Sequence, residues 1–229
     1  MLNKTVKGLP HKARVNLTAA PIFNNSIIKT DKLQTKMINL IENINFQKKY
    51  ARLSFSEEGI IKSREFEECS FESCSFIKCQ FEKVKFISCI FNECILSAVS
   101  LNGCHFIEVK FSKCKVIGFD WTKTIHIRDM EFNECQINYS DFSYLKIPGI
   151  ILAGCEAKEV DFTETDLSNG DFRKTDFEKS RFYNTNLTNA DFRGARNFYI
   201  DVKNNTLKKT RFSFPEAITL LNGLDIIIE

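Results

Sequence analysis

Hydrophobic side chains recur at every fifth residue along the centre of the chain. Over residues 64–116 these core positions are Phe66, Phe71, Phe76, Phe81, Phe86, Phe91, Leu96, Leu101, Phe106, Phe111 and Val116. Two residues before nearly every core position lies a smaller residue, which we call the small position: Cys69, Cys74, Cys79, Val84, Cys89, Cys94, Val99, Cys104, Val109 and Cys114. Since a helix repeats about every 3.6 residues and a strand about every 2, this period predicts a structural repeat.

The repeat begins at Phe55 and shifts its frame by one residue twice, near Gly59 and after Trp121. After the second shift the core positions are Ile127, Phe132, Ile137, Phe142, Ile147, Leu152, Ala157, Phe162, Leu167, Phe172, Phe177, Phe182, Leu187 and Phe192. The small positions move with them and change from mostly Cys and Val to mostly Thr, Ser, Gly and Ala. Because the two positions keep their spacing, the pattern predicts one continuous solenoid with two bulges or short loops.

The two ends of the chain depart from this period. Residues 1–29 are basic and lack a sustained pattern, which predicts a flexible or loosely docked arm. Apolar residues at helical spacing in residues 31–44 predict an amphipathic helix, which either caps the first coil or binds a partner. Residues 214–223 predict a short helix and residues 224–228 a short strand. We therefore predict three parts: an arm and capping helix (1–54), a repeat domain (55–199) and a C-terminal cap (200–229).

Several five-residue units show a family likeness: Thr165-Asp166-Leu167-Ser168-Asn169, Thr185-Asn186-Leu187-Thr188-Asn189, Ala190-Asp191-Phe192-Arg193-Gly194 and the cysteine-rich Cys69-Ser70-Phe71-Glu72-Ser73. They resemble the unit of pentapeptide-repeat proteins, and the resemblance covers roughly residues 55–195. It implies an all-β fold, a right-handed quadrilateral β-helix with four units per coil and both repeated positions pointing inward. At about 4.8 Å per coil, about seven coils would form a rod roughly 35 Å long.

The C-terminal segment resembles a smaller group within the pentapeptide-repeat proteins. Residues 204–226 are similar to the closing segment of the quinolone-resistance and microcin-immunity pentapeptide proteins. That resemblance implies binding to a type II topoisomerase, DNA gyrase or topoisomerase IV, and a homodimer joined at the C-terminal end. The candidate residues for the cap or the dimer contact are Phe214, Ile218, Leu221, Leu224 and Ile226. Two features depart from the quinolone-resistance pattern, since no large loop interrupts the coils and a basic leader of 54 residues precedes them.

The nine cysteines all fall at the small position. Three interpretations are core packing, metal ligation and disulfide bonding, and we favour packing because free cysteine behaves as a small hydrophobe. A Cys-x4-Cys spacing places successive thiols on different faces, unlike the Cys-x2-Cys pairs of zinc sites. Stacked rows are expected for Cys69 with Cys89, for Cys74 with Cys94 and Cys114, and for Cys135 with Cys155.

We predict no metal site and no cofactor. The histidines, His11, His105 and His126, accompany no catalytic constellation, and the chain has no nucleophile motif or phosphate-binding loop. The sequence therefore favours a protein without enzymatic activity.

Charge is divided unevenly along the chain. Residues 1–54 carry a net charge of +8, residues 55–212 of −2 and residues 213–229 of −3. Residues 129–191 alone carry −7, and aspartates recur beside the core position: Asp141, Asp161, Asp166, Asp171, Asp176 and Asp191. Two interpretations remain open, because such a field would attract a DNA-binding protein surface, whereas aspartate at this place is also the consensus of the repeat.

A second candidate surface is apolar. Ile77, Ile95 and Ile117 should project outward from one face, with further isoleucines on adjoining faces. An exposed apolar patch usually marks an interface, but the N-terminal arm or helix could equally cover this one.

These features predict a non-enzymatic protein that binds a bacterial type II topoisomerase through the acidic second half of the rod and imitates DNA. The alternative is an interaction scaffold or translocated effector that binds an unrelated protein through the isoleucine face or the basic arm. Direct nucleic-acid binding by the arm is a weaker hypothesis. Residues 1–25 lack an apolar stretch of signal-peptide length and no later run would span a membrane, so we expect a bacterial cytoplasmic protein.

Overall fold

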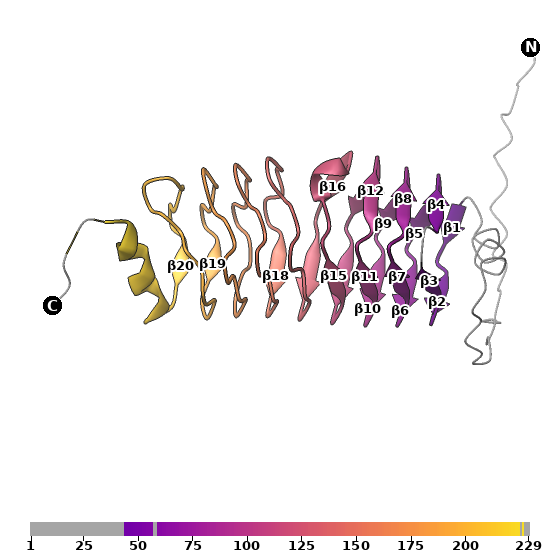
Figure 1. Ribbon diagram of the computed structural model, residues 1–229, viewed down its shortest axis with the longest axis horizontal. Helices are drawn as coiled ribbons and strands as arrows, with labels where there is room; N and C mark the ends of the chain where they lie inside the picture. Colours follow the sequence, from indigo (N-terminus) through magenta and orange to yellow (C-terminus); the bar gives the residue numbers. More distant parts are fainter. Residues whose placement is uncertain (1–43, 57–58, 225, 227–229) are drawn as a thin grey trace, which may run out of the picture.

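The five-residue period folds as one short strand followed by one corner. The computed structural model describes residues 44–56, 59–224 and 226. Four such units make a coil, and about eight coils stack into a rod that runs from the first strands at one end to the 3-10 helix η2 (Glu216–Gly223) at the other (Figure 1). The rod is therefore a parallel β-helix with four faces, as the sequence predicted.

Each face is a ladder of parallel strands, named A to D here. Face A contains β1 (Ile44–Phe46), β5 (Glu65–Glu67), β9 (Lys85–Ile87), β13 (His105–Ile107) and β16 (His126–Arg128). Face B contains β2 (Lys49–Ala51), β6 (Ser70–Glu72), β10 (Ile90–Asn92), β14 (Lys110–Ser112), β17 (Glu131–Asn133) and β18 (Ile151–Ala153), and farther along β19 (Asp191–Phe192) and β20 (Arg211–Phe212). Face C contains β3 (Ser54–Ser56), β7 (Ser75–Ile77), β11 (Ile95–Ser97) and β15 (Lys115–Ile117). Face D contains β4 (Ile60–Lys62), β8 (Gln80–Glu82) and β12 (Ser100–Asn102).

The register confirms both frame shifts. Phe71 pairs with Phe91 and Phe91 with Phe111, a separation of one 20-residue coil. Phe55 instead pairs with Phe76 and Phe111 with Phe132, so one extra residue enters each of these two coils. In the second of them the extra residue is taken up by the 3-10 helix η1 (Trp121–Lys123).

The core is a continuous column of side chains inside the rod. Phenylalanine rings stack along face B, with centroids 4.4 Å apart for Phe71 and Phe91 and 4.8 Å apart for Phe91 and Phe111. Trp121, at the core position of face D one coil after Leu101, is fully buried with its ring centroid 5.5 Å from that of Phe142, so the column stays continuous at the bulge. Ring stacking and burial together stabilise each coil on the next.

The corners explain how the chain turns with few glycines. Most corner residues are not glycine and have a positive φ, for example 52° at Glu93 and 53° at Glu134. Most corner N–H groups donate to a carbonyl of the next coil, as Glu93 does to Ser112 at 2.9 Å. The strained left-handed conformation is thus held by the ladder itself.

The described part of the rod starts at Ile44, before Phe55, where the period placed the first core position. Asn45 fills a core position of the first coil, where it is fully buried and donates from Nδ2 to the Glu65 carbonyl oxygen at 3.2 Å. Tyr50 fills the next core position and donates its hydroxyl to Asn45 Oδ1 at 2.7 Å. A polar residue at a core position hid this coil from the hydrophobic pattern.

The two ends can be compared with their predictions only in part. The helix predicted for residues 31–44 lies outside the described residues, apart from Ile44, which belongs to β1. At the other end the predicted short helix is present as η2, of the 3-10 type, after Pro215. Of the strand predicted for residues 224–228, only Leu224 and Ile226 are described.

Candidate protein-binding surfaces

The cysteines pack in the core, as predicted. All nine are free and buried. The predicted row that ends at Cys114 and the predicted row that begins at Cys135 form a single row. Cys114 N–H donates to Cys135 Sγ at 3.3 Å across the frame shift. Burial raises the pKa of Cys79 to about 11, so its thiol stays neutral and a poor nucleophile at neutral pH. In the described part of the chain no three His, Cys, Asp or Glu side chains are grouped as metal ligands.

Each of the six candidate aspartates stabilises the turn of its own repeat unit. Its carboxylate accepts a hydrogen bond from the backbone N–H two residues later. The Oδ1 to N distances are 2.8 Å for Asp141, 2.9 Å for Asp161, 3.0 Å for Asp166, 3.2 Å for Asp171, 3.2 Å for Asp176 and 3.0 Å for Asp191. This hydrogen bond is an Asx turn, and it explains why the repeat favours Asp or Asn at this place.

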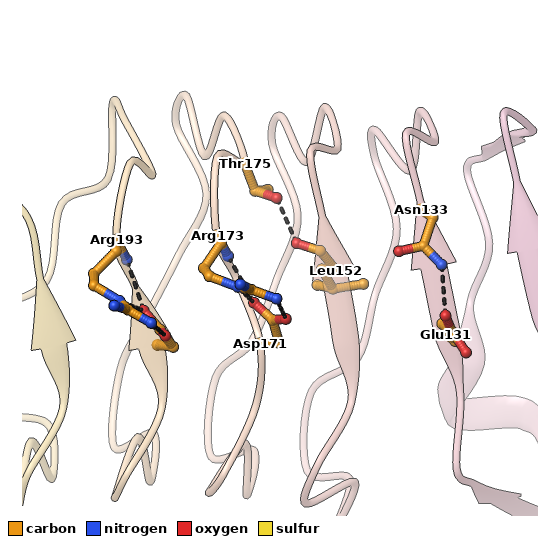
Figure 2. A network of polar contacts seen from close by, with 8 residues as sticks. Glu131, Asn133, Leu152, Asp171, Arg173, Thr175 and Arg193 are labelled. Atoms are coloured by element: carbon orange, nitrogen blue, oxygen red, sulfur yellow. Dashed lines mark hydrogen bonds and ion pairs between the residues drawn. The ribbon is translucent and has the colours of Figure 1, made fainter.

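Four of these aspartates are also paired with arginine. Arg173 and Arg193 fold back onto Asp171 and Asp191 of their own units, with an N to O distance of 2.6 Å in each pair (Figure 2). The hydrogen bond from Arg173 lowers the pKa of Asp171 below its usual value. The other two pairs join successive coils, with Arg181 on Asp161 at 3.1 Å and Arg196 on Asp176 at 3.2 Å.

The six aspartates do not form one surface. Asp141 and Asp161 lie on face D, Asp166 on face A, Asp171 and Asp191 on face B, and Asp176 on face C. The charge of the second half is therefore spread around the rod, and much of it is neutralised by neighbouring arginines.

The three candidate isoleucines do share a face. Ile77, Ile95 and Ile117 lie on β7, β11 and β15 of face C. Ile77 and Ile95 are exposed, and Ile117 is half-buried. Ser97 pairs with both Ile77 and Ile117, so a polar side chain lies between these two in their row.

The C-terminal candidates form an apolar end of the rod. Phe214 is 82% exposed, and Ile218, Leu221 and Ile226 are also exposed, whereas Leu224 is half-buried. The neighbouring Leu220 packs against the core. Helix η2 thus covers the last coil with one side and leaves apolar side chains on the other.

Four exposed tyrosines were missed by the sequence analysis. They are Tyr139, Tyr144, Tyr183 and Tyr199, all in the second half of the rod. An open hollow of about 460 Å³ is lined by Tyr183 and Tyr199 together with Lys179 and Arg181. The sequence did contain a sign of their exposure. After Tyr50, tyrosine never occupies a core position of the repeat, whereas phenylalanine often does.

Four ladders of short parallel strands around a filled aromatic core define the protein as a β-helix solenoid. The chain belongs to the pentapeptide-repeat family: residues 64–142 match the pentapeptide repeat region and residues 158–194 match pentapeptide repeats of eight copies, together just over half of the chain. No described helix is both long and apolar enough to cross a membrane.

Solved structures of similar fold include QnrB1, a plasmid-mediated fluoroquinolone resistance protein. A trypsin-treated variant of QnrB1 matches with a TM-score of 0.60 and 17% identity, covering 81% of this chain and 97% of that one. Full-length QnrB1 matches with a TM-score of 0.51 and 16% identity, covering 80% of this chain and all of that one. No curated protein matches the sequence. At this identity the likeness establishes a shared fold.

Proposed function

We propose that the protein is a non-enzymatic binding protein that engages a bacterial type II topoisomerase, DNA gyrase or topoisomerase IV, and modulates its response to quinolones. The observation that carries the proposal is the match to nearly the whole length of a fluoroquinolone resistance protein. The interior hollow lined by Phe55, Phe66 and Phe81 in the described part of the rod has a volume of only about 10 Å³, which fits a role in binding better than one in catalysis.

The dimensions of the rod support this partner. About eight coils at roughly 4.8 Å each give a length of about 40 Å. Duplex DNA rises about 3.4 Å per base pair, so the rod is as long as about twelve base pairs. A topoisomerase holds duplex DNA in a basic cleft, and the segment of the rod with a net charge of −7, residues 129–191, could occupy part of it.

The C-terminal end supports a homodimer within this proposal. Phe214, Ile218, Leu221 and Ile226 expose apolar surface beside the last coil. Burying this surface against a second copy would join two rods end to end and protect the last coil from solvent. Light scattering should then give twice the monomer mass for the wild type and the monomer mass for Phe214→Ser combined with Ile218→Ser. A monomeric wild type contradicts the dimer.

The function is tested by a DNA supercoiling assay. Purified gyrase is assayed with and without a quinolone at increasing concentrations of the full chain, and an unrelated acidic protein at the same concentrations controls for charge alone. We expect the full chain to change supercoiling or drug sensitivity at micromolar concentration. If both stay unchanged, the proposal fails.

The isoleucine surface favours a second candidate function, an interaction scaffold for a different protein. Ile77 and Ile95 are 37% and 39% exposed on face C, where water-facing isoleucine is unfavourable without a partner. This hypothesis predicts that Ile95→Glu abolishes a partner captured from the native cell, while Lys115→Glu, at the paired position of the next strand, does not. Capture unaffected by Ile95→Glu contradicts it.

A further inference from the structure

The four exposed tyrosines gather around one face of the second half. Face D continues beyond β12 and η1 through the bridges of Asp120 with Asp141, Asp141 with Asp161 and Asp161 with Arg181. Tyr139 and Tyr144 occupy the two corners on either side of this face, each with a positive φ. Tyr183 lies on the face one coil beyond Thr163, and it lines the hollow together with Tyr199. Four of the five tyrosines in the chain therefore border the same side of the rod.

Backbone hydrogen bonds fix the rows of this surface. Tyr139 N–H donates to the Lys158 carbonyl and Glu159 N–H to the Glu178 carbonyl, both at 2.9 Å, which aligns Tyr139, Glu159 and Lys179 along one edge. On the other edge, Tyr144 N–H donates to the Thr163 carbonyl at 2.9 Å and Glu164 N–H to the Tyr183 carbonyl at 2.8 Å. Each tyrosine thus lies one coil, about 4.8 Å, from a glutamate of the next corner.

Part of the acidic charge that has no arginine partner lies in the same rows. Residues 139–144 and 159–164 contain four carboxylates and no Lys or Arg. Arg181 pairs with Asp161, and Lys179 approaches Glu159 at 4.0 Å. Among the described residues, Asp141 and Glu164 form no ion pair. On faces B and C every candidate aspartate is paired, with Arg173, Arg193 or Arg196, whereas face D pairs Asp161 and leaves Asp141 without an ion pair among the described residues.

This arrangement has an energetic cost for the isolated rod. Asp141 lies between Asp120 and Asp161 along face D, and like charges directly opposite each other on neighbouring strands are destabilising. Lys123 and Arg181 pair with Asp120 and Asp161, so the unpaired charge is that of Asp141. Tyr139 and Tyr144 leave 61% and 68% of their surface in water. A partner with cationic side chains would reduce the charge repulsion and cover the exposed tyrosine rings, because Lys and Arg pair with carboxylates and also stack on tyrosine.

We propose that face D from Tyr139 to Tyr199 is a docking surface for a basic, arginine- or lysine-rich protein surface. The carboxylates Asp141 and Glu164 attract it, and Tyr139 and Tyr144 anchor it, as tyrosines do at the centres of protein interfaces. This inference rests on the proposed function only in naming the topoisomerase as the protein that supplies the basic surface.

Two probes test the surface on the full chain, purified gyrase and a peptide of nine arginines, with binding measured by titration. The test variant combines Tyr139→Ser with Tyr144→Ser, and a charge variant combines Asp141→Asn with Glu164→Gln. Asparagine at 141 retains the Asx turn, as Asn186 does by accepting from Thr188 N–H at 3.1 Å. The matched control combines Ile77→Ser with Ile95→Ser on face C, and circular dichroism checks that every variant is folded.

We expect both face D variants to weaken binding about tenfold or more and the face C control to leave it unchanged. Equal binding by the wild type and the face D variants overturns the inference, as does a wild type that binds neither probe. A wild type that binds the arginine peptide through the tyrosines but does not bind gyrase leaves the docking surface standing and removes the proposed function.

Discussion

The two halves of the rod build the same coil with different local bonds. In residues 44–134 three-residue strands pair on both sides, and the corner is held by hydrogen bonds to neighbouring coils. From Gln136 onward most strands shrink to single bridges, and many corners are closed within the unit. The N–H of Leu145, for example, donates to the carbonyl oxygen of Phe142 at 3.3 Å.

The small position shows the same contrast in chemistry. In the first half the Cys89 thiol donates to the Phe66 carbonyl oxygen, with a sulfur to oxygen distance of 3.3 Å. In the second half the Thr185 hydroxyl donates to the Phe162 carbonyl oxygen at 2.8 Å. Both partners lie 23 residues earlier in the chain. The β-helix therefore accepts either side chain, and the hydroxyl makes the stronger hydrogen bond.

The aspartates belong to the second half for the same reason. A carboxylate before the core position accepts the N–H two residues later and stabilises the tighter turn found there. In the first half this place is held by residues such as Ser75, Lys85 and Ile90, and the corner lacks that bond. The comparison shows that most of the acidic pattern serves the turn, so that only carboxylates without a basic neighbour are free to attract a partner.

The largest expected effect concerns the aromatic column of face B. Phe91→Ala removes a fully buried ring stacked between Phe71 and Phe111 and should lower the free energy of unfolding by about 3–5 kcal/mol. Leu152→Ala, on the same face in the second half, should cost about 2–4 kcal/mol because a smaller side chain is lost. Urea unfolding measures both, with exposed Ile90→Ala as the control. A Phe91→Ala variant as stable as the Ile90→Ala variant would contradict the stacked column.

We expect a smaller loss of unfolding free energy at the small position, where a hydroxyl should contribute more than a thiol. Thr175 Oγ1 donates to the Leu152 carbonyl oxygen and accepts from Cys155 N–H at 3.1 Å, so Thr175→Val leaves two buried backbone groups without partners. The expected loss is about 1–3 kcal/mol.

Cys94→Val, in the same row of the first half, should cost less than about 1 kcal/mol, since sulfur is a weak hydrogen-bonding group. Thermal and urea unfolding compare the two variants directly. Equal losses of unfolding free energy would show that the hydroxyl and the thiol contribute equally at the small position in the two halves.

The smallest effect concerns the paired aspartates. Asp171→Asn keeps an acceptor for Arg173 N–H but loses the ion pair, and it should cost less than about 1 kcal/mol at neutral pH. Because Arg173 holds the pKa of Asp171 below its usual value of about 4, the carboxylate stabilises the fold above that pH, and the contribution is lost as the pH falls through the folded pKa.

The stability difference between wild type and Asp171→Asn should therefore disappear in acid. Unfolding curves between about pH 2 and pH 7 measure it. A difference that persists at the acid end would mean that the ion pair is not its source.

Much of the fold could be predicted from the period alone. The five-residue period predicted one continuous solenoid, and both frame shifts were visible as changes of register. The four-faced β-helix with both repeated positions pointing inward was implied by the resemblance to pentapeptide-repeat proteins. The coil that contains Ile44 and Asn45 could not be found, because Asn45 is buried through hydrogen bonds that a hydrophobic pattern does not record.

The candidate surfaces depended on which residues come together in space. The isoleucines were placed on one face correctly, since residues 20 apart stack directly. The aspartates share one repeat position but fall on different faces, and their arginine partners are fixed by side-chain geometry.

The sequence by itself determined that the chain forms a repeating stack, because a five-residue hydrophobic period fits neither one helix nor one strand, and its likeness to pentapeptide repeats implied that phenylalanine and cysteine lie inside. The tertiary structure alone decided which outward side chains are neighbours. Tyr139 and Tyr144 are distant in sequence from Tyr183 and Tyr199, yet they border one face because each coil returns the chain to the same side. Charge and exposure on that face are properties of the stacked coils, and no single repeat unit contains them.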